Sequence, residues 1–182
     1  AAEIRLYDEL LQGSCADIRF HVIIESTDGL ANVMEIADAS SRIDSLLFGA
    51  VDMSADLRAA KTWETLLYAR SRVVHAAARY DLDLLDVPYL NLDDQTGLEE
   101  EALMSDALGF TGKASIHPKQ IPIINEVFSP TPELVDRARR ILAEFEKDET
   151  RLVVVDGELI ERPVIRSMLR VLAIADYLEN AG

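Results

Sequence analysis

Two acidic residues stand at positions where the strands of α/β proteins commonly bind ligands. Glu25 follows the apolar run FHVII at residues 20–24, and Asp52 follows a second apolar run and a small-residue turn. Ligands sit at the carboxyl ends of parallel strands. The spacing of 27 residues between the two acids leaves room for one helix, so both carboxylates are predicted to face one cavity. The pair indicates a hard-cation site, although acids that only cap the following helices would give the same pattern.

The other polar residues have simpler interpretations. Lys113 lies in GFTGK, which lacks the first glycine of a P-loop and has Ala114 where that motif has Ser or Thr. No nucleotide-phosphate site is therefore predicted there. Structural roles in turns, helix starts or packing are predicted for the remaining acids and histidines of interest: Asp93, Asp94, residues 99–101, His21, His75 and His117.

The elements that must position these residues alternate along the chain. Hydrophobic spacing predicts strands over residues 20–24, 43–51, 87–92 and 113–116, and helices over residues 2–12, 30–39, 62–80, 97–108, 121–128, 132–147 and 163–180. Alternating strands and helices indicate an α/β protein with a parallel sheet. Residues 151–155 and 158–160 flank Asp156-Gly157, which is a strong hairpin signal. The hairpin and the last helix lie outside the alternation, so residues 148–182 are predicted to be an appendage to residues 1–147.

Composition limits the kinds of partner. The 182 residues are 49% hydrophobic, which favours a globular fold, and their net charge of −15 makes nucleic acid and anionic membrane surfaces unsuitable partners. Cys15 is the single cysteine, so neither an internal disulfide nor a thiol-zinc cluster is predicted. No apolar run approaches the ~18 residues of a membrane span. We predict a cytoplasmic protein without a membrane segment.

The longest informative stretch runs over residues 108–131. Its sequence, LGFTGKASIHPKQIPIINEVFSPT, resembles the carboxyl-terminal segment of the citrate lyase β-subunit family of CoA-thioester lyases. The segments IIESTDG, FGAVDMSADL, NLDDQTGLEEEA and VDGELIERP occur in the order and spacing of that family. The resemblance therefore covers nearly the whole chain.

This resemblance implies a TIM (β/α)8 barrel, of which residues 1–147 would form roughly the second half. It implies that the hairpin and helix of residues 148–182 pack on a neighbouring subunit in a homotrimer or hexamer. It also implies Mg²⁺ bound by Glu25 and Asp52, with the backbone amides of Ala50, Val51 and Asp52 receiving the substrate carboxylate. Glu161 stands where the family usually has an aspartate that acts in trans, and its longer side chain changes the reach of that carboxylate.

The activity implied is that of a carbon-carbon lyase. Such an enzyme cleaves a 3-hydroxyacyl-CoA, namely citryl-CoA, malyl-CoA or citramalyl-CoA, to an acyl-CoA and a 2-oxo acid. Two alternatives stay open at this point: a metal-dependent aldolase acting on free 2-oxo acids, and a catalytically inactive scaffold relative.

Overall fold

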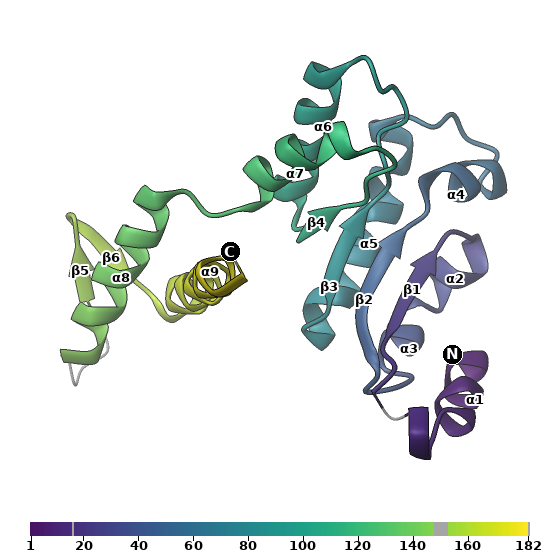
Figure 1. Cartoon of the computed structure of the whole chain (residues 1–182), viewed down its shortest axis with the longest axis horizontal. Coiled ribbons are helices and arrows are strands. Elements are labelled where there is room, and N and C mark those ends of the chain that lie inside the picture. Colours follow the sequence, from purple (N-terminus) through teal and green to yellow (C-terminus); the bar gives the residue numbers. More distant parts are fainter. Residues whose placement is uncertain (16, 148–152, 182) are drawn as a thin grey trace. The chain divides into compact units, whose positions relative to one another are not determined.

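The computed structural model describes residues 1–15, 17–147 and 153–181. Contacts divide the chain into two units, Ala1–Val127 and Phe128–Gly182. Each unit is described by itself below, with the elements labelled in Figure 1. No helix of the described residues is long and apolar enough to cross a membrane.

The first unit is built on a parallel sheet. Its strands are hydrogen-bonded in chain order, and each neighbouring pair is parallel: β1 (Phe20–Ile24), β2 (Ile43–Phe48), β3 (Asp83–Asp86) and β4 (Gly112–Lys113). This confirms the predicted α/β class with a parallel sheet. Because parallel strands in consecutive order need crossovers of one hand, the connecting helices lie on one face of the sheet.

The helices of the first unit connect and flank these strands. They are α1 (Ala2–Leu10), α2 (Thr27–Ala31), α3 (Val33–Ala37), α4 (Ala50–Asp56), α5 (Trp63–Tyr80), α6 (Gln95–Leu108) and α7 (Ile121–Phe128), with short 3-10 turns at Gly13–Cys15 and Pro118–Gln120. The longest, α5, begins with a capping box between Thr62 and Thr65 and ends at Asp81 in the left-handed conformation. It packs on β2, β3 and α3. The core therefore lies between the sheet and α5.

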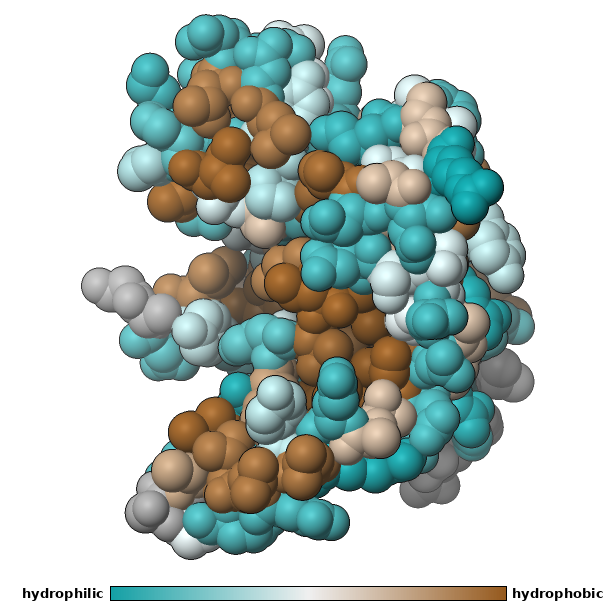
Figure 2. All heavy atoms as spheres, turned by 90° about the vertical axis from the view of Figure 1, so that its right-hand side faces the viewer, coloured by the Kyte–Doolittle hydropathy of each residue, from teal (hydrophilic) through white to brown (hydrophobic). Residues whose placement is uncertain are grey.

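The opposite face and the edges of the sheet are open among the described residues. Ile24 of β1 is 1% exposed, whereas its neighbour Ile23, which points the other way, is 53% exposed. An open groove lined by residues of β1 and α1 runs along this edge, and Figure 2 shows hydrophobic residues gathered on the side of the molecule where β1 is the edge strand. An exposed apolar edge is a surface that proteins usually cover or pair.

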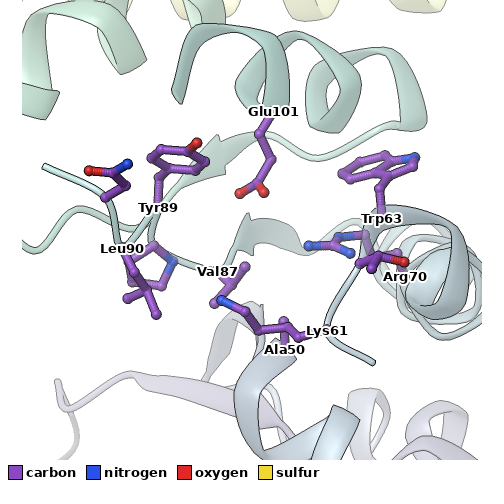
Figure 3. A pocket seen from close by; sticks show the side chains of 11 residues that line it. Ala50, Lys61, Trp63, Arg70, Val87, Tyr89, Leu90 and Glu101 are labelled. Atoms are coloured by element: carbon purple, nitrogen blue, oxygen red, sulfur yellow. The ribbon is translucent and has the colours of Figure 1, made fainter. Parts of the chain in front are cut away.

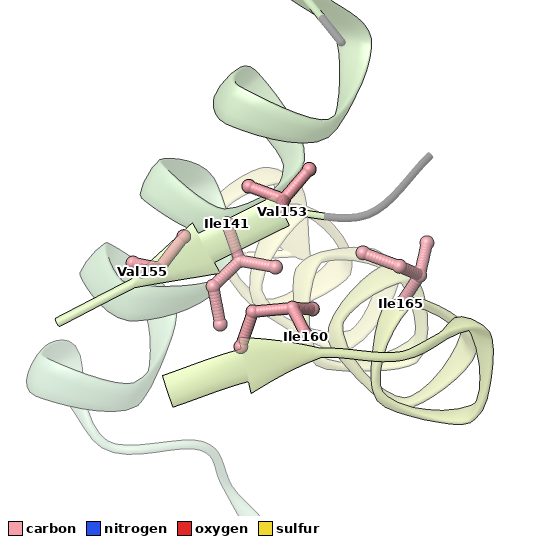
Figure 4. Close-up of a cluster of buried hydrophobic side chains, with 5 residues drawn as sticks. All are labelled: Ile141, Val153, Val155, Ile160 and Ile165. Carbon is pink, nitrogen blue, oxygen red and sulfur yellow. The ribbon is translucent and has the colours of Figure 1, made fainter. Parts of the chain in front are cut away.

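The second unit has its own small core. It contains α8 (Pro132–Lys147), the antiparallel hairpin of β5 (Val153–Val155) and β6 (Glu158–Ile160), and α9 (Arg162–Ala181). The predicted turn is confirmed, because Asp156 and Gly157 both have positive φ. Figure 4 shows the buried side chains that join the hairpin to the two helices: Ile141, Val153, Val155, Ile160 and Ile165. The predicted strand residues 151 and 152 lie outside the described residues.

Several predicted elements differ from the structure. The fourth strand is Gly112–Lys113 and not residues 113–116. The third strand is Asp83–Asp86 and not residues 87–92, because Asp81 ends α5 early enough for a strand before Pro88, which cannot donate to a ladder. Strand β2 ends at Phe48, and residues that were assigned to its end begin α4 after Gly49. The predicted helix over residues 30–39 starts earlier and is split into α2 and α3 at Asn32.

The division between units also falls earlier than the predicted boundary after residue 147. Helix α8 packs on α9 and β5, so it belongs with the hairpin rather than with the parallel sheet.

Candidate functional site

Glu25 lies against the residue that precedes α4. A Cβ added to Gly49 would lie 2.5 Å from Glu25 Cβ and 3.0 Å from Glu25 Oε2, so the carboxylate occupies space that only a glycine leaves free. Gly49 N–H donates to the carbonyl of Ile24 at 3.0 Å. The end of β1 and the start of α4 are thus in direct contact, and Asp52 follows in the first turn of α4.

The loop after Glu25 is fixed to the end of the same helix. Asp56, the last residue of α4, accepts hydrogen bonds from the N–H and the hydroxyl of Thr27 at 2.5 and 2.7 Å. These bonds, the hydroxyl first, hold the pKa of Asp56 below its ordinary value. Ser26 caps α2 by accepting from Gly29 N–H at 3.1 Å. Glu25 and Asp52 are therefore carried by two segments that are tied together at both ends of α4.

Neither Glu25 nor Asp52 has a lysine or arginine partner within the described ranges, and both are exposed. Among those residues no group of three or more His, Cys, Asp or Glu side chains could hold a metal ion. Mg²⁺ is commonly held by one or two carboxylates and keeps its other positions for water and substrate. The two acids fit that kind of ion and do not fit an ion that requires an all-protein cage.

The residues predicted to bind substrate lie beside this pair. Ala50 is buried and Val51 is exposed, and together with Asp52 they form the first turn of α4. Glu161 belongs to the second unit, where it is exposed and lies directly before α9.

A second group of charged residues, which we call the Asp86 cluster, consists of Asp86, Arg70, Lys113, Glu101 and Ser105. Asp86 ends β3 and is fully buried, and one carboxylate oxygen accepts from Arg70 Nε at 3.1 Å. Its other oxygen accepts from Lys113 Nζ at 3.1 Å and from the Ser105 hydroxyl at 2.7 Å. Lys113 Nζ also pairs with Glu101 at 2.6 Å.

The electrostatics of Asp86 reflect two opposed effects. Burial, the largest influence, would raise the pKa of Asp86, but the charges of Lys113 and Arg70 and the hydrogen bond from Ser105 outweigh it. The pKa of Asp86 therefore lies below its ordinary value, and the carboxylate is ionised. Buried charges of this kind persist because every member is paired.

A pocket of about 300 Å³ opens beside this cluster (Figure 3). Its wall comes from the loop before α5, from α5 itself, from the segment after β3, from the first turn of α4 and from the second turn of α6: Ala50, Lys61, Thr62, Trp63, Arg70, Val87, Pro88, Tyr89, Leu90, Asn91 and Glu101. Trp63 and Arg70 are seven residues apart on α5, so they lie on one side of the helix. The ring of Trp63 lies 4.5 Å from the guanidinium carbon of Arg70.

Hydrogen bonds hold the segment after β3 in place. The hydroxyl of Tyr89 donates to Asp94 at 2.7 Å, and Asp94 also accepts from Gly97 N–H at 2.9 Å as the N-cap of α6. These bonds lower the pKa of Asp94, and the same hydroxyl bond raises the pKa of Tyr89 to about 12. The side chain of Gln120 donates to the Tyr89 carbonyl at 2.7 Å.

Sequence reasoning missed the Asp86 cluster. The third strand was predicted over residues 87–92, so Asp83 and Asp86 were assigned to no element, and the acids of residues 99–101 were interpreted as a helix start in water. The signal that was present is an arginine and a lysine on otherwise apolar segments, at Arg70 and Lys113. The structural role predicted for His117 agrees with its ring nitrogen accepting from Lys119 N–H at 3.1 Å.

Comparison with known proteins places the chain in a family. The sequence profile of the HpcH/HpaI aldolase/citrate lyase family matches residues 2–118. The chain is 32% identical to the citrate lyase subunit beta of Leuconostoc mesenteroides subsp. cremoris over 84% of its residues and 52% of that protein. It is 34% identical to the L-malyl-CoA/beta-methylmalyl-CoA lyase of Rhodobacter capsulatus over 87% of its residues and 57% of that protein.

A solved structure agrees with these relatives. Protein CitE from Mycobacterium tuberculosis, in complex with magnesium, acetoacetate and coenzyme A, is 27% identical and gives a TM-score of 0.73 over 89% of this chain and 62% of that chain. The chain thus spans little more than half the length of its relatives. From the profile match and the shared fold, the chain belongs to the HpcH/HpaI aldolase/citrate lyase family.

Proposed function

We propose that this chain forms part of a Mg²⁺-dependent carbon-carbon lyase that cleaves a 3-hydroxyacyl-CoA into an acyl-CoA and a 2-oxo acid. The observation that carries the proposal is the contact between Glu25 and Gly49, which joins one exposed carboxylate to the helix that bears the other. Family membership and a relative solved with magnesium, acetoacetate and coenzyme A support the same chemistry.

In this proposal Glu25 and Asp52 hold the metal ion. When bound, Mg²⁺ polarises oxygen atoms of the substrate and stabilises the negative charge that develops as a carbon-carbon bond breaks. The backbone amides of Ala50, Val51 and Asp52 receive the substrate carboxylate. The choice among citryl-CoA, malyl-CoA and citramalyl-CoA depends on pocket shape, since one methylene changes discrimination by only about 1–3 kcal/mol.

We further propose that the sheet is part of a (β/α)8 barrel. Three observations support a sheet with further strands. The outer edge of β1 has no partner strand among the described residues, the side chain of Ile23 is exposed, and the chain covers about half of the relatives' length. The second unit would then pack on a neighbouring subunit of a homotrimer or hexamer and bring Glu161 to that subunit's site. The cytoplasm stays the predicted location.

The test is to replace each acid in the full-length protein. Glu25→Gln and Asp52→Asn should each lower Mg²⁺ affinity, measured by calorimetry, and reduce cleavage of the three CoA thioesters at least 100-fold. Glu99→Gln changes an exposed acid on α6 and serves as the matched control. Unchanged Mg²⁺ affinity and cleavage in both site variants would contradict the metal assignment.

The family also contains aldolases, so the second candidate is a metal-dependent aldolase acting on free 2-oxo acids. Thermal protection separates the two, because a ligand stabilises the state to which it binds. Protection by acetyl-CoA favours the lyase, whereas protection by pyruvate with Mg²⁺ alone favours the aldolase. A folded protein that binds no Mg²⁺ at millimolar concentration would be an inactive scaffold relative.

A further inference from the structure

The pocket beside the Asp86 cluster contains a buried cation with an unused hydrogen-bond donor. Arg70 lines the pocket and is 3% exposed. Its Nη1 atom is buried without a hydrogen-bond partner, the single side-chain atom for which this holds in residues 1–15, 17–147 and 153–181. Buried donors are almost always paired, because leaving one unpaired destabilises the fold. A ligand that accepts from Arg70 would remove that cost.

The guanidinium is held in one orientation. Its Nε donates to Asp86 at 3.1 Å, and its guanidinium carbon lies over the rings of Trp63 and Phe48, at 4.5 and 5.0 Å from their centroids. The contacts with two rings and with Asp86 leave Nη1 as the buried nitrogen of the group without a hydrogen-bond partner. A donor that is already oriented loses little entropy when it binds a ligand.

The charges around the pocket favour an anion. In Figure 3 the ammonium of Lys61 and the guanidinium of Arg70 point into the pocket, opposite the carboxylate of Glu101. That carboxylate is already paired with Lys113, and Asp86 is paired with Arg70 and Lys113. Three cations against two carboxylates leave one positive charge, which Lys61 carries on the exposed side of the pocket.

We infer that this pocket is an oxyanion site, in which Arg70 and Lys61 receive one anionic group of the ligand against the ring of Trp63. It does not use the proposed metal ligands, since neither Glu25 nor Asp52 lines it. A volume of about 300 Å³ accommodates a phosphate or a short carboxylic acid but not an entire coenzyme A. This inference rests on the proposed function. The anionic group is either a phosphate of the acyl-CoA or the carboxylate of the 2-oxo acid, which would then lie between these side chains and the proposed backbone amide of Ala50, a residue that also lines the pocket.

The experiment measures ligand affinity by calorimetry and by the fluorescence of Trp63, the only tryptophan of these 182 residues. The full-length protein is titrated with coenzyme A, with inorganic phosphate and with pyruvate in the presence of Mg²⁺. Lys61→Ala removes the exposed cation without touching the Asp86 cluster. Lys119→Ala, an exposed lysine outside the pocket, is the matched control. Arg70→Lys keeps the charge and removes the planar fork, and its fold is checked by circular dichroism.

If the pocket binds a phosphate of the acyl-CoA, coenzyme A changes Trp63 fluorescence and inorganic phosphate competes with it. Lys61→Ala then lowers the affinity for coenzyme A about tenfold. If the pocket binds the carboxylate of the 2-oxo acid, the same changes are seen with pyruvate and Mg²⁺. In either case folded Arg70→Lys lowers the affinity for the same ligand, and Lys119→Ala leaves that affinity unchanged.

The inference is overturned if Lys61→Ala and folded Arg70→Lys bind Mg²⁺, coenzyme A and pyruvate with the same affinity as the native protein. The proposed function would survive that result. The opposite result is a protein that binds no Mg²⁺ but still binds coenzyme A or phosphate with a change in Trp63 fluorescence. That result would contradict the proposed function and support the oxyanion site.

Discussion

Acidic residues at the ends of neighbouring strands meet two different environments in this protein. Asp86 at the end of β3 is fully buried and accepts from Arg70, Lys113 and Ser105. Glu25, after β1, and Asp52, in the first turn after β2, are exposed and have no cationic partner among the described residues. The carboxylate of Asp86 is therefore used in interactions within the fold, whereas the carboxylates of Glu25 and Asp52 are accessible to a ligand.

The difference comes from what stands behind each strand end. Helix α5 brings Arg70, helix α6 brings the hydroxyl of Ser105 and strand β4 brings Lys113, and these groups offset the cost of burying Asp86. Gly49 presents only backbone to Glu25, and the residue Glu25 is exposed. A buried, paired acid should control stability, and an exposed, unpaired acid should control binding.

The largest expected effect tests the buried side of this comparison. Asp86→Asn should lower the free energy of unfolding by about 3–5 kcal/mol, because Arg70 and Lys113 would remain buried without their counter-charge. Urea unfolding at pH 7 measures it. Asp93→Asn, an exposed acid in the segment after β3, is the control and should change stability by less than about 0.5 kcal/mol. Equal stability of the two variants would show that the Asp86 cluster is not needed for folding.

The next effect concerns pH. Because the pKa of Asp86 is lowered in the folded protein, its contribution is fully present above the ordinary value of about 3.9 and is lost as the pH falls through that value toward the folded pKa. The stability difference between the native protein and Asp86→Asn should therefore shrink between about pH 5 and pH 3. Urea unfolding across this range measures it. A difference that stays constant would contradict the paired, ionised state of Asp86.

A smaller effect separates hydrogen bonding from charge within the cluster. Ser105→Ala removes the 2.7 Å bond to Asp86 but keeps both cations. We expect a loss of about 1.5 kcal/mol, the low end for a hydrogen bond to a charged group. Ser71→Ala on α5 is the matched control for urea unfolding. A loss as large as that of Asp86→Asn would mean that the hydroxyl, and not the cations, holds the carboxylate.

The smallest expected effect is on the exposed side. Glu25→Gln and Asp52→Asn should change the free energy of unfolding by less than about 0.5 kcal/mol, even though both should impair Mg²⁺ binding. The midpoint of urea unfolding without Mg²⁺ measures it. A loss of several kcal/mol would show that these acids are structural and would remove the contrast with Asp86.

The sequence by itself determined the elements whose cause is local. An apolar run with a polar end placed β1 at residues 20–24, an apolar stripe at helical spacing placed α5, and Asp156-Gly157 placed the hairpin turn. It also singled out Glu25 and Asp52, because a strand-end acid is visible without any partner.

Only the tertiary structure decided the rest. Asp86 joins Arg70 from 16 residues earlier and Lys113 from 27 residues later, and no local pattern reports such pairing. The predicted third strand lay at residues 87–92, whereas the structure forms it at Asp83–Asp86 and buries Asp86 at its end. Hydrophobic periodicity reports which side chains are apolar, whereas the burial of a charge depends on counter-charges that folding alone brings together.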